Sequence, residues 1–142
     1  MRDEMNLARS SGSSSRRPYQ TGRAVGQKNG SQTATQVDWL VDTGSDYAVV
    51  WRTIGNAFDV VLAVGVTASP TTGGGGIQVV TGITTEFEVE DSYGVAHTRQ
   101  SSKYVGIKSN NAKSNVLGME QLADVGASVT WDPSSNQGTM RI

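Results

Sequence analysis

The sequence predicts an all-β domain that carries one short helix near its C-terminal end. Three observations support this fold class. Glycine accounts for 17 of the 142 residues, with valine, threonine and serine recurring throughout. Short apolar segments alternate with turn signals, and one segment alone has convincing helical spacing. Many short strands joined by tight turns are typical of a β-barrel or a β-sandwich.

The N-terminal segment differs in composition from the rest of the chain. Residues 1–28 hold six basic and two acidic residues, although the whole chain has a net charge of −1. The serine-rich stretch 10–15 has no hydrophobic periodicity. We therefore expect residues 1–20 to form a flexible basic tail and residues 21–142 to form one domain. The tail is interpreted as a solvated segment, with a weak nucleic-acid contact as the alternative.

Composition also excludes several classes of function. The net charge of −1 and the pI of about 5.7 argue against a bulk electrostatic partner such as DNA or an anionic membrane. The absence of cysteine excludes disulfides, thiolate zinc sites and cysteine nucleophiles. No apolar run reaches the roughly 18–20 residues of a membrane span, and the start lacks the apolar centre of a signal peptide. We expect a soluble chain, intracellular or part of a larger polyprotein.

The strands are predicted from alternation and from the turns between them. Asn29-Gly30 is a two-residue hairpin signal, because both positions tolerate positive φ. It separates 23–28 from 32–41, where Val37, Trp39 and Val41 fall on one face. Further strands are expected at 47–51, 58–66, 77–81, 83–90 and 95–105, with turns at Gly82 and 92–94.

The C-terminal part predicts the helix and a last hairpin. Met119, Leu122 and Val125 have helical spacing within 118–125, and Gly126 stands in a stop position. Residues 128–131 and 139–142 could pair as a hairpin. His97 is the only histidine, which rules out multi-histidine metal sites, so we expect it to be a surface strand residue. No metal ligands and no cofactor are predicted.

One segment carries the chemical signal. A predicted apolar strand leads directly to Asp42, which is followed by Thr43-Gly44-Ser45 and then by a second apolar run. Aspartic proteases hold one water between two carboxylates: an ionised one removes a proton from the water, and a protonated one donates to the substrate carbonyl. Gly44 lets the backbone turn sharply and approach a substrate. The hydroxyls of Thr43 and Ser45 can orient the carboxylate.

Two further motifs follow in order. Val116-Leu117-Gly118 precedes the short helix, Gly126-Ala127 and a strand, and a glycine-rich segment at 72–79 lies between this motif and Asp42. This combination resembles the retropepsins, the single-domain aspartic proteases of retroviruses and retrotransposons. The resemblance covers residues 23–142. It implies a retropepsin-like acid protease barrel whose glycine-rich hairpin, the flap, closes over a bound peptide.

The resemblance also implies roles in the catalytic loop. Asp42 would be the catalytic aspartate, and Thr43 would brace the two active-site loops of a dimer across its axis. Gly44 would offer its carbonyl to the substrate backbone, and Ser45 would hydrogen-bond the outer oxygen of Asp42. Because that bond would favour the ionised carboxylate, we predict an acidic pH optimum.

Substrate-binding residues are implied in the same way. Asp46 and Tyr47 would bind the main chain of an extended peptide of about six to eight residues. Ser114 and Val116 would line side-chain pockets. The flap tip would consist of Gly73, Gly74, Gly75 and Gly76. Met119 stands where many retroviral members have an arginine that pairs with the residue matching Asp46, so that pair is not expected.

The stoichiometry follows from the number of motifs. No second Asp-Thr/Ser-Gly occurs in the chain, so one chain supplies half of a catalytic pair and a homodimer with an isologous contact is required. The sequence thus predicts an aspartic endopeptidase acting on protein or peptide substrates. The alternative is an inactive dimerising or peptide-binding module that keeps the fold.

Overall fold

The computed structural model describes residues 18–63, 65, 76–111, 114–132, 134–135 and 137–142. Within them the chain forms strands throughout and two short helices, so the predicted all-β class is confirmed. The elements in chain order are β1 (Tyr19–Lys28), β2 (Ser31–Val41), β3 (Ala48–Val50), α1 (Arg52–Gly55), β4 (Val61–Leu62), β5 (Ile77–Thr81), β6 (Ile83–Glu90), β7 (Ala96–Ser101), β8 (Val105–Lys108), β9 (Asn115–Leu117), α2 (Met119–Val125), β10 (Ser128–Asp132) and β11 (Gln137–Arg141).

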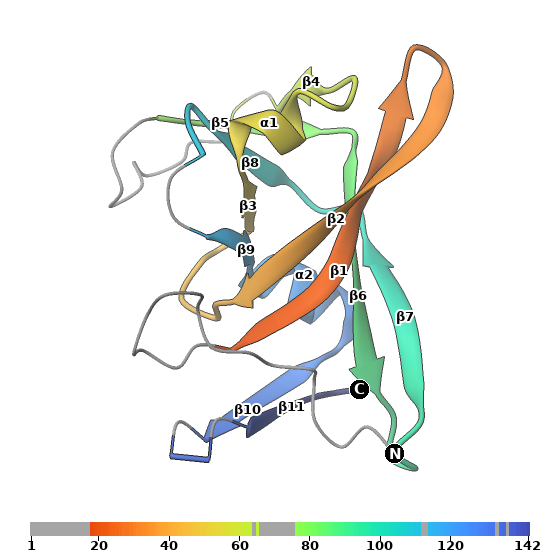
Figure 1. Ribbon diagram of the computed structural model, residues 1–142, viewed down its shortest axis with the longest axis vertical. Helices are drawn as coiled ribbons and strands as arrows, with labels where there is room; N and C mark the ends of the chain where they lie inside the picture. Colours follow the sequence, from red (N-terminus) through yellow and green to blue (C-terminus); the bar gives the residue numbers. More distant parts are fainter. Residues whose placement is uncertain (1–17, 64, 66–75, 112–113, 133, 136) are drawn as a thin grey trace.

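β1 and β2 are the longest strands, and the tip of the hairpin that they form projects from one end of the molecule (Figure 1). Asn29 and Gly30 form its turn with φ of 52° and 81°, which confirms the predicted turn. β1 starts at Tyr19, two residues before the predicted start of the domain. Gln20 is buried and exchanges hydrogen bonds of 2.7 and 2.9 Å with the backbone of Glu88, which fixes β1 against β6.

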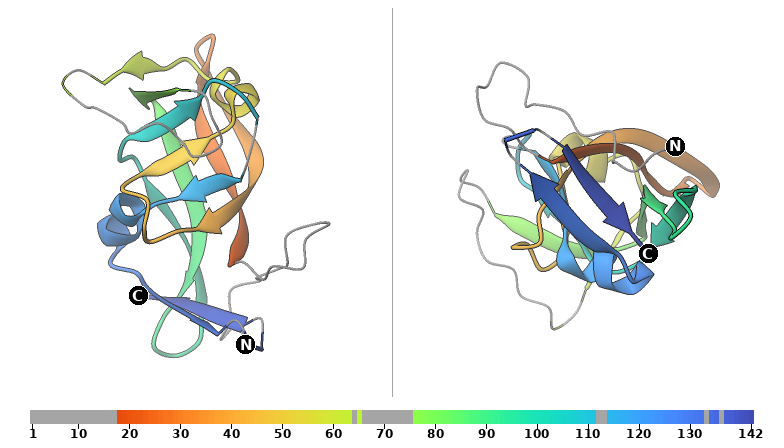
Figure 2. Two further views of the ribbon diagram at one scale, coloured as in Figure 1. Left: turned by 90° about the vertical axis from the view of Figure 1, so that its left-hand side faces the viewer. Right: turned by 90° about the horizontal axis from the view of Figure 1, so that it is seen from below.

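All strands of the described residues join in one sheet, in the order β10-β11-β6-β1-β2-β9-β3-β8-β5-β4, with β7 on the free side of β6. The sheet curls around a single core, giving a barrel-like shape (Figure 2). β2 lies parallel to β9, and β3 lies between β9 and β8. These pairings bring the Asp42 segment against the chain just before α2. The largest fully buried apolar side chains are Trp39, Phe87, Ile83, Leu117, Leu122 and Met140.

Several predicted element boundaries are wrong, and two short elements were not predicted. The expected strand 95–105 is two strands, because β7 pairs with β6 whereas β8 pairs with β3 and β5. In the expected strand 58–66, the described part forms only the short β4, and Phe58 is buried in the core. β9 and α1 were not predicted: three and four residues are too short to show a period.

The C-terminal segment follows the prediction closely. α2 ends at Val125, and Gly126 caps it in the left-handed conformation with φ of 71°. β10 and β11 form the expected hairpin, and the Ile142 N–H donates to the Glu90 carbonyl at 2.9 Å. Trp39 is fully buried. No helix of the described residues is long and apolar enough to cross a membrane.

Candidate active site

Asp42 lies directly after β2, and its position is fixed by the neighbouring strand. Its N–H donates to the Leu117 carbonyl at 3.0 Å, which extends the parallel pairing of β2 and β9 by one residue. The side chain is half-buried. The Gly44 N–H donates to Asp42 Oδ1 at 2.9 Å, and the Ser45 N–H donates to the Asp42 carbonyl at 3.1 Å. The chain thus turns tightly around this carboxylate.

The first turn of α2 fixes the loop that follows Asp42. The N–H groups of Met119 and Glu120 donate to the carbonyls of Ser45 and Asp46, at 2.7 and 2.8 Å. These are among the N–H groups that have no partner within a helix. A Cβ at Gly118 would lie 2.4 Å from the Tyr47 carbonyl carbon, so only glycine allows this approach. The Gly118 motif therefore acts on the Asp42 loop directly.

Ser45 differs from the expectation. Its Oγ donates to the Tyr47 carbonyl at 2.8 Å and makes no hydrogen bond to Asp42. A hydroxyl has a single hydrogen to donate, so in this chain Ser45 shapes the loop. The donor to the carboxylate is the backbone N–H of Gly44. The acidic pH optimum stays a prediction.

Asp42 shares one face of the sheet with several other side chains. Leu40 is two residues before it, and residues two apart on a strand point to the same face. Val116 pairs with Leu40 in the register of β2 and β9, and Tyr19 pairs with Leu40 from the other side. Paired residues also point to one face. Tyr19, Leu40, Val116 and Ser114 are all half-buried, as a partly open floor beside Asp42 requires.

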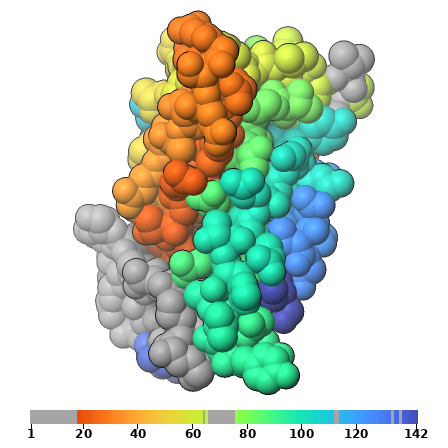
Figure 3. Space-filling model, turned by 90° about the vertical axis from the view of Figure 1, so that its right-hand side faces the viewer, coloured from red at the N-terminus to blue at the C-terminus, as the bar shows by residue number. Residues whose placement is uncertain are grey.

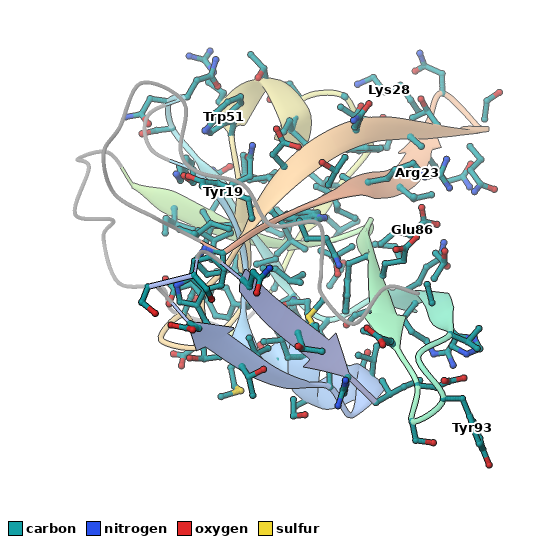
Figure 4. All side chains as sticks on the ribbon, turned by 60° about the horizontal axis from the view of Figure 1, so that its bottom comes forward. Tyr19, Arg23, Lys28, Trp51, Glu86 and Tyr93 are labelled. Atoms are coloured by element: carbon teal, nitrogen blue, oxygen red, sulfur yellow. The ribbon has the colours of Figure 1, made fainter. Side chains whose placement is uncertain are left out.

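Ser114 is held from two strands at once. The Tyr19 hydroxyl and Ser114 Oγ are hydrogen-bonded at 2.5 Å, and Lys108 Nζ donates to the Ser114 carbonyl at 2.8 Å. Beside it, Asn115 Oδ1 accepts the Trp51 N–H at 2.7 Å. Tyr19 and Trp51 lie on the same side of the molecule in Figure 4, with the Arg23–Glu86 ion pair on the other side.

Sequence reasoning missed Tyr19 and Lys108 as neighbours of the site. Tyr19 was assigned to the tail, although it is the first aromatic residue of the chain and stands immediately after Pro18. Lys108 had no signal, because a lysine at the end of an apolar strand usually marks an exposed end. The structure buries Lys108 to 5% exposure.

The outer end of the loop carries negative charge. Partial burial raises the pKa of Tyr47, and the nearby charges of Asp46 and Glu120 raise it further. Asp46 is exposed and forms no ion pair among the described residues. Met119, which was not expected to pair with Asp46, is 47% exposed. Asp46 and Tyr47 are therefore adjacent to α2, and main-chain binding by them stays a prediction.

The remaining predicted residues are only partly placed. Thr43 and Gly44 are exposed at the tip of the loop, and the role of Thr43 across a dimer axis stays a prediction. Gly73, Gly74 and Gly75 lie outside the described residues. Gly76 is exposed directly before β5, and its carbonyl accepts the Ser109 N–H at 3.1 Å.

The strands that flank the glycine-rich segment are paired. β4 and β5 are antiparallel, with Val61 opposite Thr81 and Leu62 opposite Val80. Val61 and Leu62, which are consecutive on β4, are 68% and 59% exposed.

Other chemistry is limited among the described residues. They contain no group of three or more histidine, cysteine, aspartate or glutamate side chains that could hold a metal ion. His97 lies on β7, as predicted, and its Nε2 contacts Asp91 Oδ2 at 2.7 Å. Neither finding points to a second reactive centre.

Comparison with known proteins finds similarity to solved structures. No family model matches the chain, and no curated protein matches it. The chain is similar to the solved structure of EIAV protease complexed with the inhibitor HBY-793, with 22% sequence identity and a TM-score of 0.40. The match covers 79% of this chain and 90% of that one. A similarity of this size assigns neither a family nor an activity.

Proposed function

We propose that this chain is one half of a retropepsin-type aspartic endopeptidase, which hydrolyses peptide bonds as a homodimer with Asp42 of each copy in the catalytic pair. One observation carries the proposal. Asp42 is held at the end of β2 in a loop that α2 and Gly118 fix from outside, while among the described residues only Gly44 donates to its carboxylate. A carboxylate positioned in this way retains hydrogen-bonding capacity for a water and a second carboxyl group.

The mechanism follows from pairing two such groups. Two carboxylates close together cannot both be ionised, so they share one proton. The ionised member takes a proton from the water as it attacks the peptide carbonyl, and the protonated member donates to the carbonyl oxygen. A single chain offers only Asp42 for this task, so assembly on a twofold axis is required for catalysis.

The substrate would be an extended peptide. Leu40 and Val116 supply an apolar floor beside Asp42, with Ser114 at its edge. The paired strands β4 and β5 would carry the flap, and exposed Val61 and Leu62 offer apolar surface on it. Asp46 and Tyr47 would hold the peptide main chain further out. No metal or organic cofactor takes part in this chemistry.

A peptide library tests the proposal directly. Incubation at pH 4–6, with and without a pepstatin-like inhibitor, should give inhibitor-sensitive cleavage by the wild-type chain. D42N should cleave at least about 100-fold more slowly, whereas D38N should cleave at the wild-type rate. Asp38 is a matched control because it lies on β2, the strand that leads to Asp42, is exposed and accepts a hydrogen bond from Thr21. Cleavage by D42N at the wild-type rate would refute the assignment.

One observation favours a second candidate, a peptide-binding or dimerising module without catalysis. Ser45 Oγ is bonded to the Tyr47 carbonyl, so the expected support of Asp42 by this hydroxyl is missing. Such a module would bind library peptides without cleaving them, and D42N would bind them as the wild type does. Calorimetry with peptides that survive the cleavage assay separates the two functions.

A further inference from the structure

We infer that Tyr19 and Lys108 are positioning residues that fix Ser114 beside the Asp42 face, and that this anchor sets the size of the substrate side chain accepted next to Asp42. The second part rests on the proposed function; the anchor itself does not. The three residues come from β1, from β8 and from the segment directly before β9. They are called the Ser114 anchor below.

Lys108 supplies the backbone half of the anchor. It is the last residue of β8, 5% exposed, and stands opposite Ile77 of β5. An ammonium group is costly to bury unless hydrogen bonds satisfy it. Its Nζ donates to the Ser114 carbonyl at 2.8 Å. The burial of this charge is thus coupled to the position of the Ser114 backbone.

Tyr19 supplies the side-chain half. Its hydroxyl and Ser114 Oγ lie 2.5 Å apart, and its backbone pairs with Leu40. The carbonyl of Ser114 is therefore hydrogen-bonded to β8, and its hydroxyl is hydrogen-bonded to β1. Each bond restrains a different part of Ser114, so the residue has little freedom to move away from the face.

The register connects the anchor to the site. Val116 follows Ser114 by two residues, pairs with Leu40 of β2 and lies opposite Val49 of β3. Leu40 in turn precedes Asp42 by two residues. Displacement of Ser114 would move the edge of the floor formed by Leu40 and Val116, while Asp42 stays fixed by Leu117 and α2. The anchor should therefore affect which side chains bind more than the chemical step.

Two variants and two matched controls test the inference. Y19F removes one hydroxyl, and K108M removes the ammonium while keeping an unbranched apolar stem. Y93F and K103M make the same changes at exposed residues, because Tyr93 is 87% exposed and the Lys103 side chain is 52% exposed. Y19F is the milder change, so the test stands even if K108M fails to fold.

The first measurement needs no substrate. Amide hydrogen exchange at Asn115 and Val116 in the intact chain reports local opening of the segment. We expect about tenfold faster exchange in Y19F and K108M, and wild-type rates in Y93F and K103M. Unchanged exchange in both anchor variants would overturn the anchor.

The second measurement uses two peptides that differ by one apolar side chain, alanine or leucine, at the position next to the cleaved bond. In the anchor variants the ratio of kcat/KM between the peptides should change by about five- to tenfold, through KM, with kcat for the better peptide retained. Faster exchange with an unchanged ratio would overturn the specificity claim alone. Absence of any cleavage by the wild type would instead refute the proposed function, and the exchange data would still decide the anchor.

Discussion

Asp42 and Asp91 are both aspartates in turns that follow a strand, yet their carboxylates are used in opposite ways. Asp91 follows β6 and holds its own turn: Oδ1 accepts the N–H groups of Tyr93 and Val95, at 2.8 and 3.0 Å, and Oδ2 contacts His97. The Asp42 carboxylate accepts one N–H, from Gly44, and other elements hold its loop. Figure 3 shows the turn between β6 and β7 at the bottom of the face that it draws.

The difference separates a structural carboxylate from one available for chemistry. Hydrogen bonds to His97 and to the backbone lower the pKa of Asp91, because they stabilise its charged form. Its oxygens are occupied in keeping the turn closed. The turn after Asp42 is instead held closed by the first N–H groups of α2 and by the close approach of Gly118. The backbone fixes the loop, and the carboxylate remains available.

The largest expected effect comes from exchanging the two aspartates for asparagine. D42N should lower kcat by about 100- to 10,000-fold, because a homodimer of this variant has lost both carboxylates of the acid–base pair, and should leave the unfolding midpoint near the wild-type value. D91N should lower the unfolding midpoint and leave cleavage intact. Peptide cleavage and thermal unfolding of both variants provide the measurement. If D91N lost activity and D42N retained it, Asp91 and not Asp42 would be the carboxylate used in catalysis.

Next in size is the effect of G118A on the Asp42 loop. The added methyl group would lie 2.4–2.6 Å from three Tyr47 backbone atoms, none of which can rotate away. We expect a loss of about 3 kcal/mol in the free energy of unfolding, the upper part of the usual range for overpacking. Urea denaturation measures it. A loss below that of G126A would show that the loop tolerates displacement.

G126A should have a smaller effect at the opposite end of the same helix. Gly126 has φ of 71° with open space around it, so alanine meets strain but no clash. The left-handed conformation should cost about 1 kcal/mol for an L-residue. Because this end does not touch the Asp42 loop, we expect KM and kcat to stay at wild-type values, whereas G118A should impair both.

The smallest effect concerns acid stability. The pKa of Asp91 in the folded chain lies below its ordinary value of 3.8. Its contribution to stability is therefore fully present above that value and is lost as the pH falls through the folded pKa. The difference in unfolding midpoint between wild type and D91N should be constant from pH 7 to about pH 5 and shrink towards pH 2. A difference that grows on acidification would contradict this sign.

Much of the fold was predictable because its signals are local. The Asn29-Gly30 turn, the strands 77–81 and 83–90, and the stop at Gly126 each depend on neighbouring residues. β9 could not be predicted, because it is a strand only through pairing with β2 and β3. The start of β1 was missed because Gln20 is a polar core residue, and its burial depends on its bonds to Glu88.

In the candidate site, too, local sequence signals were predictable and contacts between distant strands were not. Asp42 and the Gly118 motif were recognisable from residue types in order, and the structure shows why they belong together: the helix amides meet the loop carbonyls. The partner of Ser45 Oγ was predicted wrongly, since rotamer and loop geometry decide between two acceptors close in sequence. Tyr19 and Lys108 escaped notice because their contacts with Ser114 cross from one strand to another.

The sharing of one catalytic pair between two chains is tested most directly by mixing subunits. Wild-type chain is held at a fixed concentration, unfolded and refolded with an equal amount of D42N, and assayed for peptide cleavage. If each active pair needs Asp42 from both copies, random pairing should reduce the activity to about half, and further D42N should reduce it towards zero. Activity that stays unchanged as D42N is added would show that each chain acts alone and would contradict the account.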